Sequence, residues 1–443
     1  METVRQSAGA TDAPEVRPCP ECGTEVTAHA SYVTWCAACD WNVDPGAPDP
    51  ERGRLAKVRR RLAARYGEQL AEEIGRGGSG SGSGTGRVGP GGSTVLAFGL
   101  ALLVHGVTAG LFLAAVVLII GGWHTGIQPV LGVVLLVAVA VLMPRPGRAP
   151  SGPVVLYRAD APELFGLIDE VGAAVGTTGV HAVVVDSSPN AWVSSYGYRG
   201  RRVMCLGLGL WEILTPQERV ALLGHELGHF ANGDIRSSFL MNGALRSLAE
   251  WHAVLVPVPR GTLMDWFMHA VTFLPRWTVY GLIRLLDGLT LRASQRAEYL
   301  ADTGAARAGS GGAAVTLLDR LLVATAVEAH LRRESMAVAR AGGGPGGREV
   351  REAAERELWE RLAARIGSVP ESEYERLRRV SARRGHSVDD THPPTHLRRR
   401  CLASADPQPA LVVCDGPRAQ AVAAELAPAR AEMARQVIRD HAG

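Results

Sequence analysis

The sequence predicts an α+β protein that is mainly α-helical. Three observations predict this class: two C-x₂-C pairs near the N-terminus, two long uncharged apolar runs after them, and one H-E-x-x-H pentapeptide in mid-chain. At 443 residues the chain is long enough for more than one domain. We expect a zinc ribbon over 15–45, an Arg-rich helix and Gly/Ser linker over 46–92, a transmembrane hairpin over 93–145, the H-E-x-x-H domain over 150–405 and a C-terminal helical segment over 406–443.

The cysteine pairs predict a structural zinc site. They comprise Cys19, Cys22, Cys36 and Cys39, with 13 residues between the second and third cysteines. This spacing is typical of a Cys₄ zinc ribbon, and Trp35 and Trp41 can cover a core that needs metal to hold it. A redox dithiol is the alternative, but no thioredoxin-like unit surrounds either pair.

The purpose of the ribbon is left open by the sequence. It can bind a protein partner, nucleic acid or the rest of this chain. Basic and aromatic residues do not alternate near it, and the net charge is only +3, so nucleic acid is the weaker choice. The other three cysteines are scattered, which disfavours a disulfide framework and favours a reducing compartment.

Two apolar runs predict membrane spans. An Arg-rich stretch, Arg52–Ile74, reads as helical, and Gly75–Gly92 reads as a flexible linker. Val95–Ile120 has no charged residue and is long enough to cross a bilayer, and Ile127–Met143 follows after a short loop. A buried helical pair is the alternative. Arginines flank the hairpin at both ends but not its loop, so both ends are expected on the cytoplasmic side of the cell membrane.

His225-Glu226-Leu227-Gly228-His229 predicts a catalytic metal site. Histidines four residues apart lie on one helical face, so both rings can reach one Zn²⁺, and Glu226 can take a proton from a metal-bound water. The helix has its own signals. Thr215-Pro216-Gln217-Glu218 is a capping box with proline at the first helical position, and Asn232-Gly233 supplies a stop.

A third ligand is expected from a second helical segment that ends near Gly309. Glu298 and Asp302 are four residues apart, so they share one face of that helix. Glu298 can complete a His₂Glu site, and Asp302 can accept a hydrogen bond from a ligand imidazole. A solvated acidic face is the alternative interpretation of the same pair.

The motifs together resemble the HtpX and CAAX prenyl protease family of membrane zinc metallopeptidases. The matching segments, from about Tyr157 to Leu402, are Ser188-Pro189-Asn190-Ala191-Trp192, the H-E-x-x-H helix with Ala231-Asn232-Gly233-Asp234, Arg296-Ala297-Glu298-Tyr299-Leu300-Ala301-Asp302, and Thr391-His392-Pro393-Pro394 with Arg398. The resemblance implies a zincin-like metallopeptidase domain with a small edge-strand sheet. The N-terminal ribbon is an addition to the family pattern.

The resemblance also implies residue roles. The zinc ligands would be His225, His229 and Glu298, with Glu226 as general base and Asp302 orienting a ligand histidine. His392 and Arg398 would lie near the metal, where they could stabilise the oxyanion or hold the Glu298 helix. His392 could also occupy the open metal position at rest, or be an ordinary turn histidine. Asn190 and Ala191 would contact substrate beside an edge strand formed by Val180–Val185.

The expected function is that of a membrane-anchored, zinc-dependent endopeptidase with a cytoplasm-facing site. Its cofactors would be one catalytic and one structural Zn²⁺. Its partners would be polypeptide substrates, with membrane proteins in quality control among them. The lipid bilayer and a possible protein partner of the ribbon would be the other two partners. One alternative is a catalytically silent zinc-bound scaffold that recruits partners through the ribbon. Another is a CAAX-type processing protease, which would need many spans.

The remaining segments are expected to be mostly helical. Central charges interrupt Ser237–Pro259 and Trp266–Leu289, which predicts interfacial or lid helices rather than spans. Leu317–Arg340 reads as helical and Glu349–Arg379 as a solvated charged helix. Leu411–Val413 reads as a short strand, and Ala419–Arg439 as a helix that breaks or kinks at Pro428.

Overall fold

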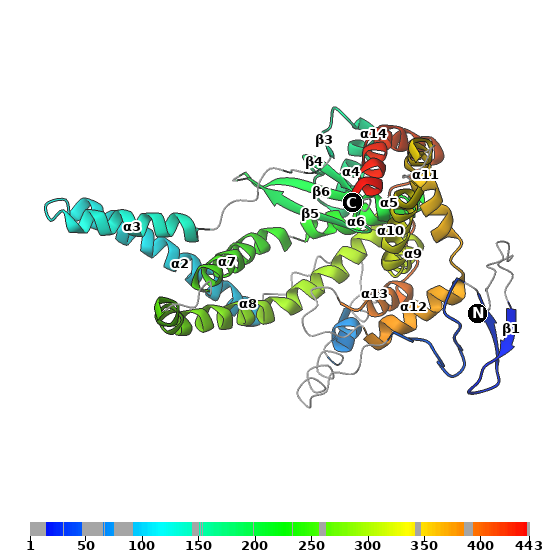
Figure 1. The fold of residues 1–443 in the computed structure, drawn as a ribbon, viewed down its shortest axis with the longest axis horizontal. Coiled ribbons are helices and arrows are strands. Elements are labelled where there is room, and N and C mark those ends of the chain that lie inside the picture. The colour runs from blue at the N-terminus through cyan, green and yellow to red at the C-terminus, as the bar shows by residue number, and fades with distance from the viewer. Residues whose placement is uncertain are drawn as a thin grey trace.

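The computed structural model is mainly helical and contains two small sheets (Figure 1). It describes residues 15–29, 31–46, 65, 67–74, 92–143, 150, 152, 154–197, 199–232, 234–256, 263–341, 347–384 and 393–440. Of the predicted Arg-rich helix, residue 65 and residues 67–74 are described, and they are helical. The rest of that helix, and the predicted linker before Gly92, lie outside the described residues.

The N-terminal module is a two-stranded hairpin followed by a second loop. Strand β1 (Glu15–Pro18) pairs antiparallel with β2 (Glu25–Ala28). Gly23, in the turn after the first cysteine pair, has a φ of 74°, a conformation that favours glycine. The core of the module is small: Cys19, Val26 and Cys36 are buried, and Trp41 packs against them. A core of this size depends on a further cross-link, which agrees with the predicted metal.

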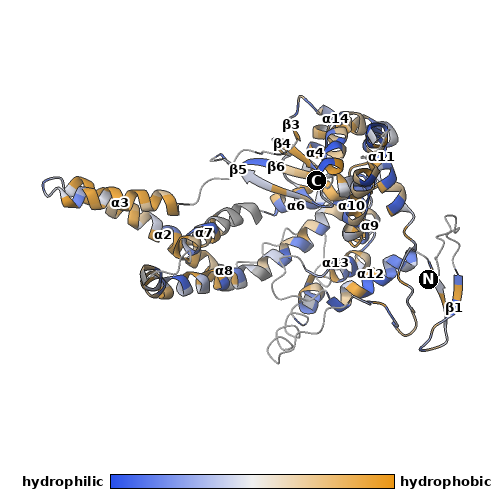
Figure 2. Ribbon diagram, in the orientation of Figure 1, coloured by the Kyte–Doolittle hydropathy of each residue, from blue (hydrophilic) through white to orange (hydrophobic). Residues whose placement is uncertain are grey.

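Two apolar helices follow, close to the predicted bounds. Helix α2 (Gly92–Gly121) and helix α3 (Ile127–Leu142) pack against each other. The fit is closest at Gly132, where an added Cβ would lie 2.7 Å from the side chain of Ile119 and 2.8 Å from the carbonyl of Ala115. Figure 2 shows both helices as predominantly hydrophobic, and most of their large apolar side chains are exposed. Within the described residues, the segment Val95–Gly121 alone is both long and apolar enough to cross a membrane.

The second sheet has four strands in the order β3-β4-β6-β5. Their bounds are Val154–Leu156 for β3, Ala182–Asp186 for β4, Ala191–Tyr196 for β5 and Arg201–Gly207 for β6. Strand β6 pairs in parallel with β4 and antiparallel with β5. The prediction that Val180–Val185 forms an edge strand is therefore wrong. Strand β4 is interior because it pairs with β3 on one side and with β6 on the other, and the edge strand next in sequence to Asn190 is β5.

One main core joins the sheet to the helices around it. Helices α4 (Pro162–Val175), α5 (Leu208–Trp211) and α6 (Pro216–Ala231) contribute large, fully buried side chains, among them Phe165, Trp211 and Leu223. Alternate residues of the sheet, such as Val183 and Met204, face the same core. This packing fixes α6 against the sheet and α4.

Helix α8 is longer than expected. Helix α7 (Asp234–Leu255) matches the first predicted amphipathic segment, but Trp266–Leu289 and the segment carrying Glu298 form one continuous helix, α8 (Leu263–Gly309). The first half of α8 packs with α7 and α2 around a second apolar cluster, which includes Ala101, Met241, Leu248 and Leu286. The second half packs on α6. Figure 1 shows α8 running from the projecting helical layer into the globular domain.

The C-terminal third is helical and wraps the globular domain. Its elements are α9 (Gly311–Leu321), α10 (Ala324–Ala341), α11 (Gly347–Gly367), α12 (Glu371–Arg384), α13 (Thr395–Ser404) and α14 (Gly416–Asp440). Helix α14 continues through Pro428 without a break. The predicted strand at Leu411–Val413 is wrong. The backbone N–H groups of Leu411 and Val412 instead donate to the carbonyls of Arg307 and Ala308 at the end of α8.

Candidate metal centre

Helix α6 places both histidines of the H-E-x-x-H sequence on one face. The predicted capping box is present: the side chain of Thr215 accepts from the N–H of Glu218, and the carboxylate of Glu218 accepts from the N–H of Thr215. Ten residues later, the rings of His225 and His229 lie edge to face with centroids 5.0 Å apart. Glu226 points from the same helix turn and is buried. The local sequence therefore orients these three side chains before any tertiary contact is considered.

Small residues bring α8 against this face. An added Cβ on Gly224 would lie 2.8 Å from the Cβ of Ala308 and 2.9 Å from the carbonyl of Gly304. One on Gly228 would lie 3.0 Å from the Cα of Ala301. The two helix backbones can approach this closely because glycine and alanine line the contact. The close approach is what allows a carboxylate on α8 to reach histidines on α6.

Glu298 completes a cluster of three candidate ligands. Its Oε2 lies 3.6 Å from Nε2 of His225, and its Oε1 lies 3.8 Å from Nε2 of His229. One ligand atom from each of the three side chains lies within 4.8 Å of the others. Donors about 2.0–2.1 Å from a tetrahedral Zn²⁺ would be about 3.3 Å apart, slightly closer than these pairs. The donor types and the separations therefore fit a zinc ion with a His₂Glu ligand set.

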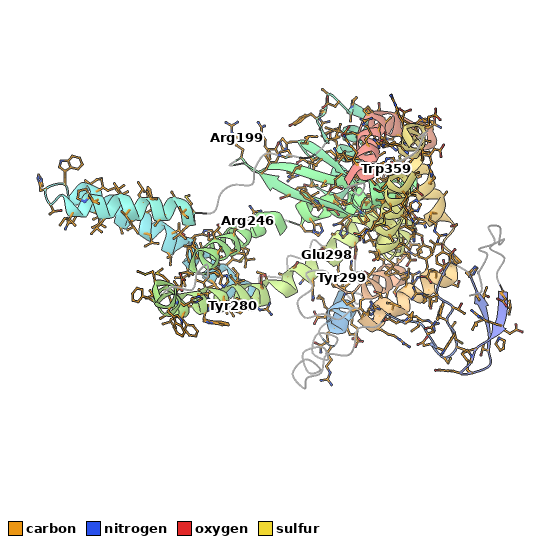
Figure 3. The ribbon with its side chains drawn as sticks, viewed as in Figure 1. Arg199, Arg246, Tyr280, Glu298, Tyr299 and Trp359 are labelled. Carbon is orange, nitrogen blue, oxygen red and sulfur yellow. The ribbon has the colours of Figure 1, made fainter. Side chains whose placement is uncertain are left out.

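Asp302 and Arg398 support this cluster from behind. Oδ1 of Asp302 lies 3.1 Å from Nδ1 of His225, on the side of the ring away from Glu298. Arg398 on α13 donates from Nε and Nη2 to the two oxygens of Asp302, at 2.8 and 2.6 Å, and its Nη1 lies 3.2 Å from Oε2 of Glu298. All three of these charged side chains are buried. Figure 3 shows Glu298 and Tyr299 on the part of α8 that enters the globular domain.

Electrostatics keep this group ionised. Burial alone raises the pKa of Asp302, but the charge and hydrogen bonds of Arg398, together with His225, outweigh it and hold that pKa at about 2. Burial likewise disfavours the charged form of Arg398, yet the carboxylates of Asp302 and Glu298 raise its pKa above the usual value. An ionised Asp302 accepts the Nδ1 proton of His225, which leaves Nε2 as the nitrogen that is free to bind a metal.

Comparison with known proteins now identifies the domain. The model of one protein family, "Peptidase family M48", matches residues 161–405, which is more than half of the chain. The chain belongs to peptidase family M48. The matched span holds the histidines, Glu226, Glu298, Asp302 and Arg398.

The chain is also similar to curated proteins that are named as proteases. The chain is 26% identical over 172 residues to the protein named Protease HtpX of Chromohalobacter salexigens, an alignment covering 36% of this chain and 56% of the relative. It is 26% identical over 208 residues to a Protease HtpX homolog of Thiobacillus denitrificans, an alignment that covers 45% of this chain and 70% of that relative. It is 32% identical over 106 residues to a Protease HtpX homolog of Syntrophobacter fumaroxidans, an alignment that covers 22% of this chain and 37% of that relative. The chain spans about half the length of the curated relatives it matches, and no solved structure matches it.

The ribbon lies outside the M48 match and holds a second candidate metal site. Its four cysteines form no disulfide, and within the described part of the chain they form a second cluster of potential metal ligands. Sγ atoms lie 3.7 Å apart for Cys19 and Cys39 and 3.6 Å apart for Cys22 and Cys36. Thiolates about 2.3 Å from a tetrahedral Zn²⁺ would be about 3.8 Å apart, so these distances fit a Cys₄ zinc.

The other predicted site residues differ in how the structure places them. Ala191 is buried at the start of β5, and Asn190 is exposed just before it. Both therefore lie at the β5 edge rather than beside β4. His392 lies outside the described residues. Sequence reasoning missed Gly224 and Gly228 of α6 and Gly304 of α8, although the spacing of four between the two α6 glycines is a readable sign of a close helix contact.

Proposed function

We propose that this protein is a zinc-dependent endopeptidase anchored in a membrane. The observation that carries the proposal is the convergence of His225, His229 and Glu298, with their ligand atoms within 4.8 Å, beside the carboxylate of Glu226 in an M48 domain. Three protein ligands and one open position are the arrangement of catalytic zinc sites, whereas structural sites use four protein ligands. The names of the relatives, Protease HtpX and its homologs, favour the same chemistry.

The roles of the side chains follow from their places. Zinc at this site would act as a Lewis acid that polarises the scissile carbonyl and lowers the pKa of water toward about 7. Glu226 lies on the same helix turn as both histidine ligands, so we assign it the general base that takes a proton from the attacking water. Glu226 then returns the proton to the leaving amine. Asp302 fixes the tautomer of His225 through Nδ1.

Arg398 is a positioning residue in this proposal. Its side chain is buried, and its nitrogens already contact Asp302 and Glu298. A guanidinium held in this way keeps the Glu298 helix in place and does not need to reach the substrate. We therefore prefer this role for Arg398 to that of an oxyanion donor.

Substrate would bind along strand β5. This strand is an edge of the four-stranded sheet among the described residues, and it packs next to α6. An extended peptide can add to such an edge through main-chain hydrogen bonds, which gives affinity with little sequence preference. Asn190 and Ala191 stand at the end of β5 where the strand begins, so they would contact the bound chain.

The membrane anchor would consist of α2 and α3, with α7 and the first half of α8 beside them. The exposed side chains on α8 include Met264, Trp266, Phe267, Leu274 and Trp277, and Trp266 is 79% exposed. Exposed apolar surface of this extent suits contact with lipid or with its interface. A hydrogen bond links the C-terminal ends of α3 and α7, in which Nε1 of Trp251 donates to the carbonyl of Leu142. Arginines on both flanks of the hairpin favour a cytoplasmic ribbon and M48 domain.

Membrane proteins are the substrate class that this arrangement favours, which suits a role in membrane-protein quality control. Helix α8 carries both the exposed aromatic residues and Glu298, so the site lies on the same helix as the anchor. Polypeptides at the membrane surface would therefore be presented close to strand β5.

The decisive experiment compares wild type with Glu226→Gln, purified in detergent. Both proteins are assayed for zinc content and for cleavage of casein. We expect two zinc ions per chain in both, and cleavage in wild type alone. Glu349→Gln, at an exposed position on α11, is the matched control and should behave as wild type. Zinc in all three proteins with no cleavage in any would favour a silent scaffold, and cleavage by Glu226→Gln would refute the base assignment.

A further inference from the structure

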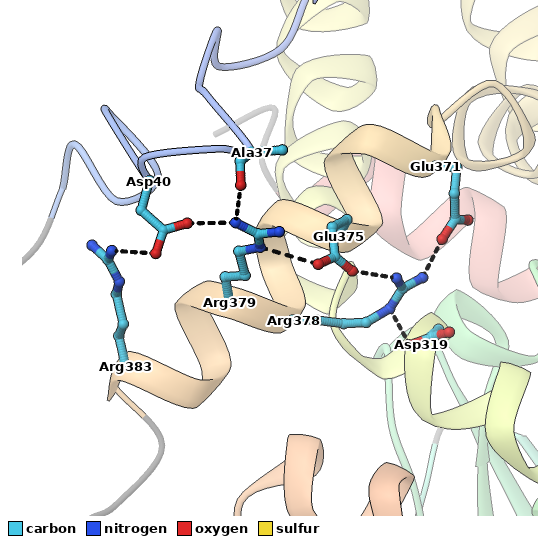
Figure 4. Close-up of polar contacts among 8 residues, drawn as sticks. All are labelled: Ala37, Asp40, Asp319, Glu371, Glu375, Arg378, Arg379 and Arg383. Atoms are coloured by element: carbon cyan, nitrogen blue, oxygen red, sulfur yellow. Dashed lines mark hydrogen bonds and ion pairs between the residues drawn. The ribbon is translucent and has the colours of Figure 1, made fainter. Parts of the chain in front are cut away.

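The zinc ribbon lies against helix α12 of the M48 domain. Figure 4 shows the centre of the contact, where Asp40 of the ribbon faces two arginines of α12. Nη1 of Arg379 donates to Oδ1 of Asp40 at 2.5 Å and to the carbonyl of Ala37 at 2.7 Å. Nη2 of Arg383 donates to Oδ2 of Asp40 at 2.8 Å. The solvated charged face expected for this part of the chain is therefore occupied by the ribbon.

The contact extends to both sides of Asp40. Nε of Arg384 donates to Oδ2 of Asp44 at 2.6 Å, and buried Arg376 donates from Nη1 to the carbonyl of Val43 at 2.8 Å. The guanidinium of Arg379 also lies over the ring of Trp35, 4.9 Å from its centroid. The two acidic residues and the buried tryptophan therefore match a basic helix in charge and supply an aromatic face for one of its arginines.

The same helix contacts α13 through a chain of ion pairs. Glu375 accepts from Nε of Arg379 at 3.0 Å and from Nη1 of Arg378 at 2.8 Å. Nε of Arg378 donates to Oδ1 of Asp319 at 3.0 Å, and Nε of Arg399 donates to the same oxygen at 2.9 Å. Figure 4 shows the part of this chain that runs from Asp40 to Asp319. Arg399 belongs to α13, so the contacts link the ribbon to that helix.

Helix α13 is also the helix that supports the candidate metal centre. Arg398, next to Arg399, carries the hydrogen bonds to Asp302 and the ion pair with Glu298. A second N-terminal segment contacts the same region. In the helix over 67–74, Leu70 and Ala71 are buried against Tyr299 of α8 and Leu397 of α13. The N-terminal part of the chain therefore contacts this region at two places. The ribbon contacts α12, and the helix over 67–74 contacts α13 and α8 next to Glu298.

We propose that the ribbon is an intramolecular clamp that depends on its own metal and holds Arg398 in place at the His225–His229–Glu298 site. The inference rests on the proposed function, because it concerns control of the same metal centre. Loss of metal from the ribbon would free α12, loosen α13 and weaken metal binding some distance away in the fold.

The dependence on metal follows from the build of the ribbon. Its acidic contact residues lie on the loop of the second cysteine pair: Asp40 follows Cys39 directly, and Asp44 is four residues further on. Asp40 has a φ of 59°, and its N–H donates to the carbonyl of Cys36. With only a few buried residues to hold it, this loop would keep its shape only while the four thiolates share an ion.

The test uses the full-length chain in detergent, in the Glu226→Gln background, so that no readout depends on turnover. Asp40→Asn with Asp44→Asn removes both charges, and asparagine tolerates the positive φ of Asp40. Arg379→Ala removes the α12 side chain that donates to Asp40 and to the carbonyl of Ala37. Glu15→Gln with Glu25→Gln is the control, because it makes the same charge change at exposed positions on the β1–β2 hairpin. Cys36→Ser with Cys39→Ser removes the ribbon metal itself.

Three quantities are measured for each protein. Hydrogen exchange of α12 reports docking. With Co²⁺ in place of zinc, thiolate charge-transfer absorption reports ribbon occupancy alone. Competition with a chelator gives the metal dissociation constant of the His₂Glu site. We expect both contact variants and the cysteine variant to speed exchange in α12 and to weaken metal binding at the His₂Glu site by about five-fold or more, while the control matches the Glu226→Gln parent.

Two results would overturn the clamp. One is faster exchange in α12 with an unchanged dissociation constant at the His₂Glu site, since docking would then not be coupled to the metal centre. The other is unchanged exchange in both contact variants, since these residues would then not hold the ribbon. Coupling in the Glu226→Gln series, together with no casein cleavage by the wild-type protein, would refute the proposed function and leave the clamp standing.

Discussion

Arg398 donates two hydrogen bonds to Asp302, and the same carboxylate faces Nδ1 of His225. This bidentate ion pair between a guanidinium and a carboxylate joins α13 to α8 next to His225, a candidate metal ligand. Both side chains are buried, so each depends on the other to offset the loss of water. The relationship makes Arg398 part of the structure of the site and separates its role from that of Glu226.

Replacing Arg398 by methionine should destabilise the protein strongly. The substitution leaves the buried carboxylates of Asp302 and Glu298 without their cation, a change that costs about 3–5 kcal/mol in other proteins. The apparent free energy of unfolding of the detergent-purified chain, measured by pulse proteolysis, would report it. Arg400→Met, two residues along the same helix and exposed, is the control and should change stability little. Equal stability of the two variants would contradict the assigned role of the pair.

Asp302→Asn should weaken metal binding with a smaller effect on folding than Arg398→Met, because Arg398 keeps its ion pair with Glu298 at 3.2 Å. The amide keeps the shape of the side chain but no longer offers a charged acceptor to His225, so the ring loses its fixed tautomer. Loss of such partners typically lowers metal affinity by about 10–100-fold. The zinc dissociation constant of the His₂Glu site, obtained by chelator competition, is the measurement. An affinity equal to that of wild type would show that Asp302 does not orient His225.

Gly224→Ala should separate α6 from α8. The new methyl group would meet the Cβ of Ala308 at 2.8 Å and the carbonyl of Gly304 at 2.9 Å, and neither has a flexible end that can move aside. Overpacking of this kind costs about 1–3 kcal/mol, and it should also lower zinc content because Glu298 moves away from the histidines. Gly166→Ala is the matched control in α4, where nothing lies within 4 Å of an added Cβ. That control should stabilise its helix by up to about 1 kcal/mol, and a destabilised Gly166→Ala would undermine the comparison.

Val193→Pro should impair substrate binding while leaving the sheet intact. The N–H of Gly207 donates to the carbonyl of Asn190, so hydrogen-bonded pairing with β6 alternates from Asn190 to Trp192 and Ser194. The N–H of Val193 therefore points to the open edge, where proline is tolerated. We expect KM for a model peptide to rise by up to about ten-fold, the value of one lost hydrogen bond. Ser194→Pro should instead destabilise the sheet, and an unchanged KM for Val193→Pro would argue against binding at this edge.

The sequence predicted best those parts of the site that local chemistry determines. The capping box at Thr215 and Glu218 formed as expected, because it involves contacts between neighbouring residues only. The four-residue spacing of Glu298 and Asp302 likewise put both on one face of a helix, and that face is turned toward His225. Their roles as metal ligand and supporting carboxylate remain predictions.

Non-local arrangement was harder to read. Neighbours along the chain suggested that the strand before Asn190 is an edge, yet β6, which comes later, pairs between β4 and β5. Trp266–Leu289 and the segment that carries Glu298 read as two separate helices, but α8 runs through both without a break because Thr290–Gln295 contains neither glycine nor proline. The arginines of α12 looked like a solvated face, since nothing local shows that a ribbon more than 300 residues earlier supplies Asp40.

Helix α8 has a mechanical consequence. Its 47 residues make one rod of about 70 Å, with Trp266 in the first turn and Glu298 about 48 Å further along. A tilt of the aromatic end therefore also displaces a candidate metal ligand, apart from any bending that Pro275 absorbs within the helix. In a lipid bilayer, membrane thickness and lateral pressure would then act mechanically, through a rigid helix, on the geometry of the candidate metal centre.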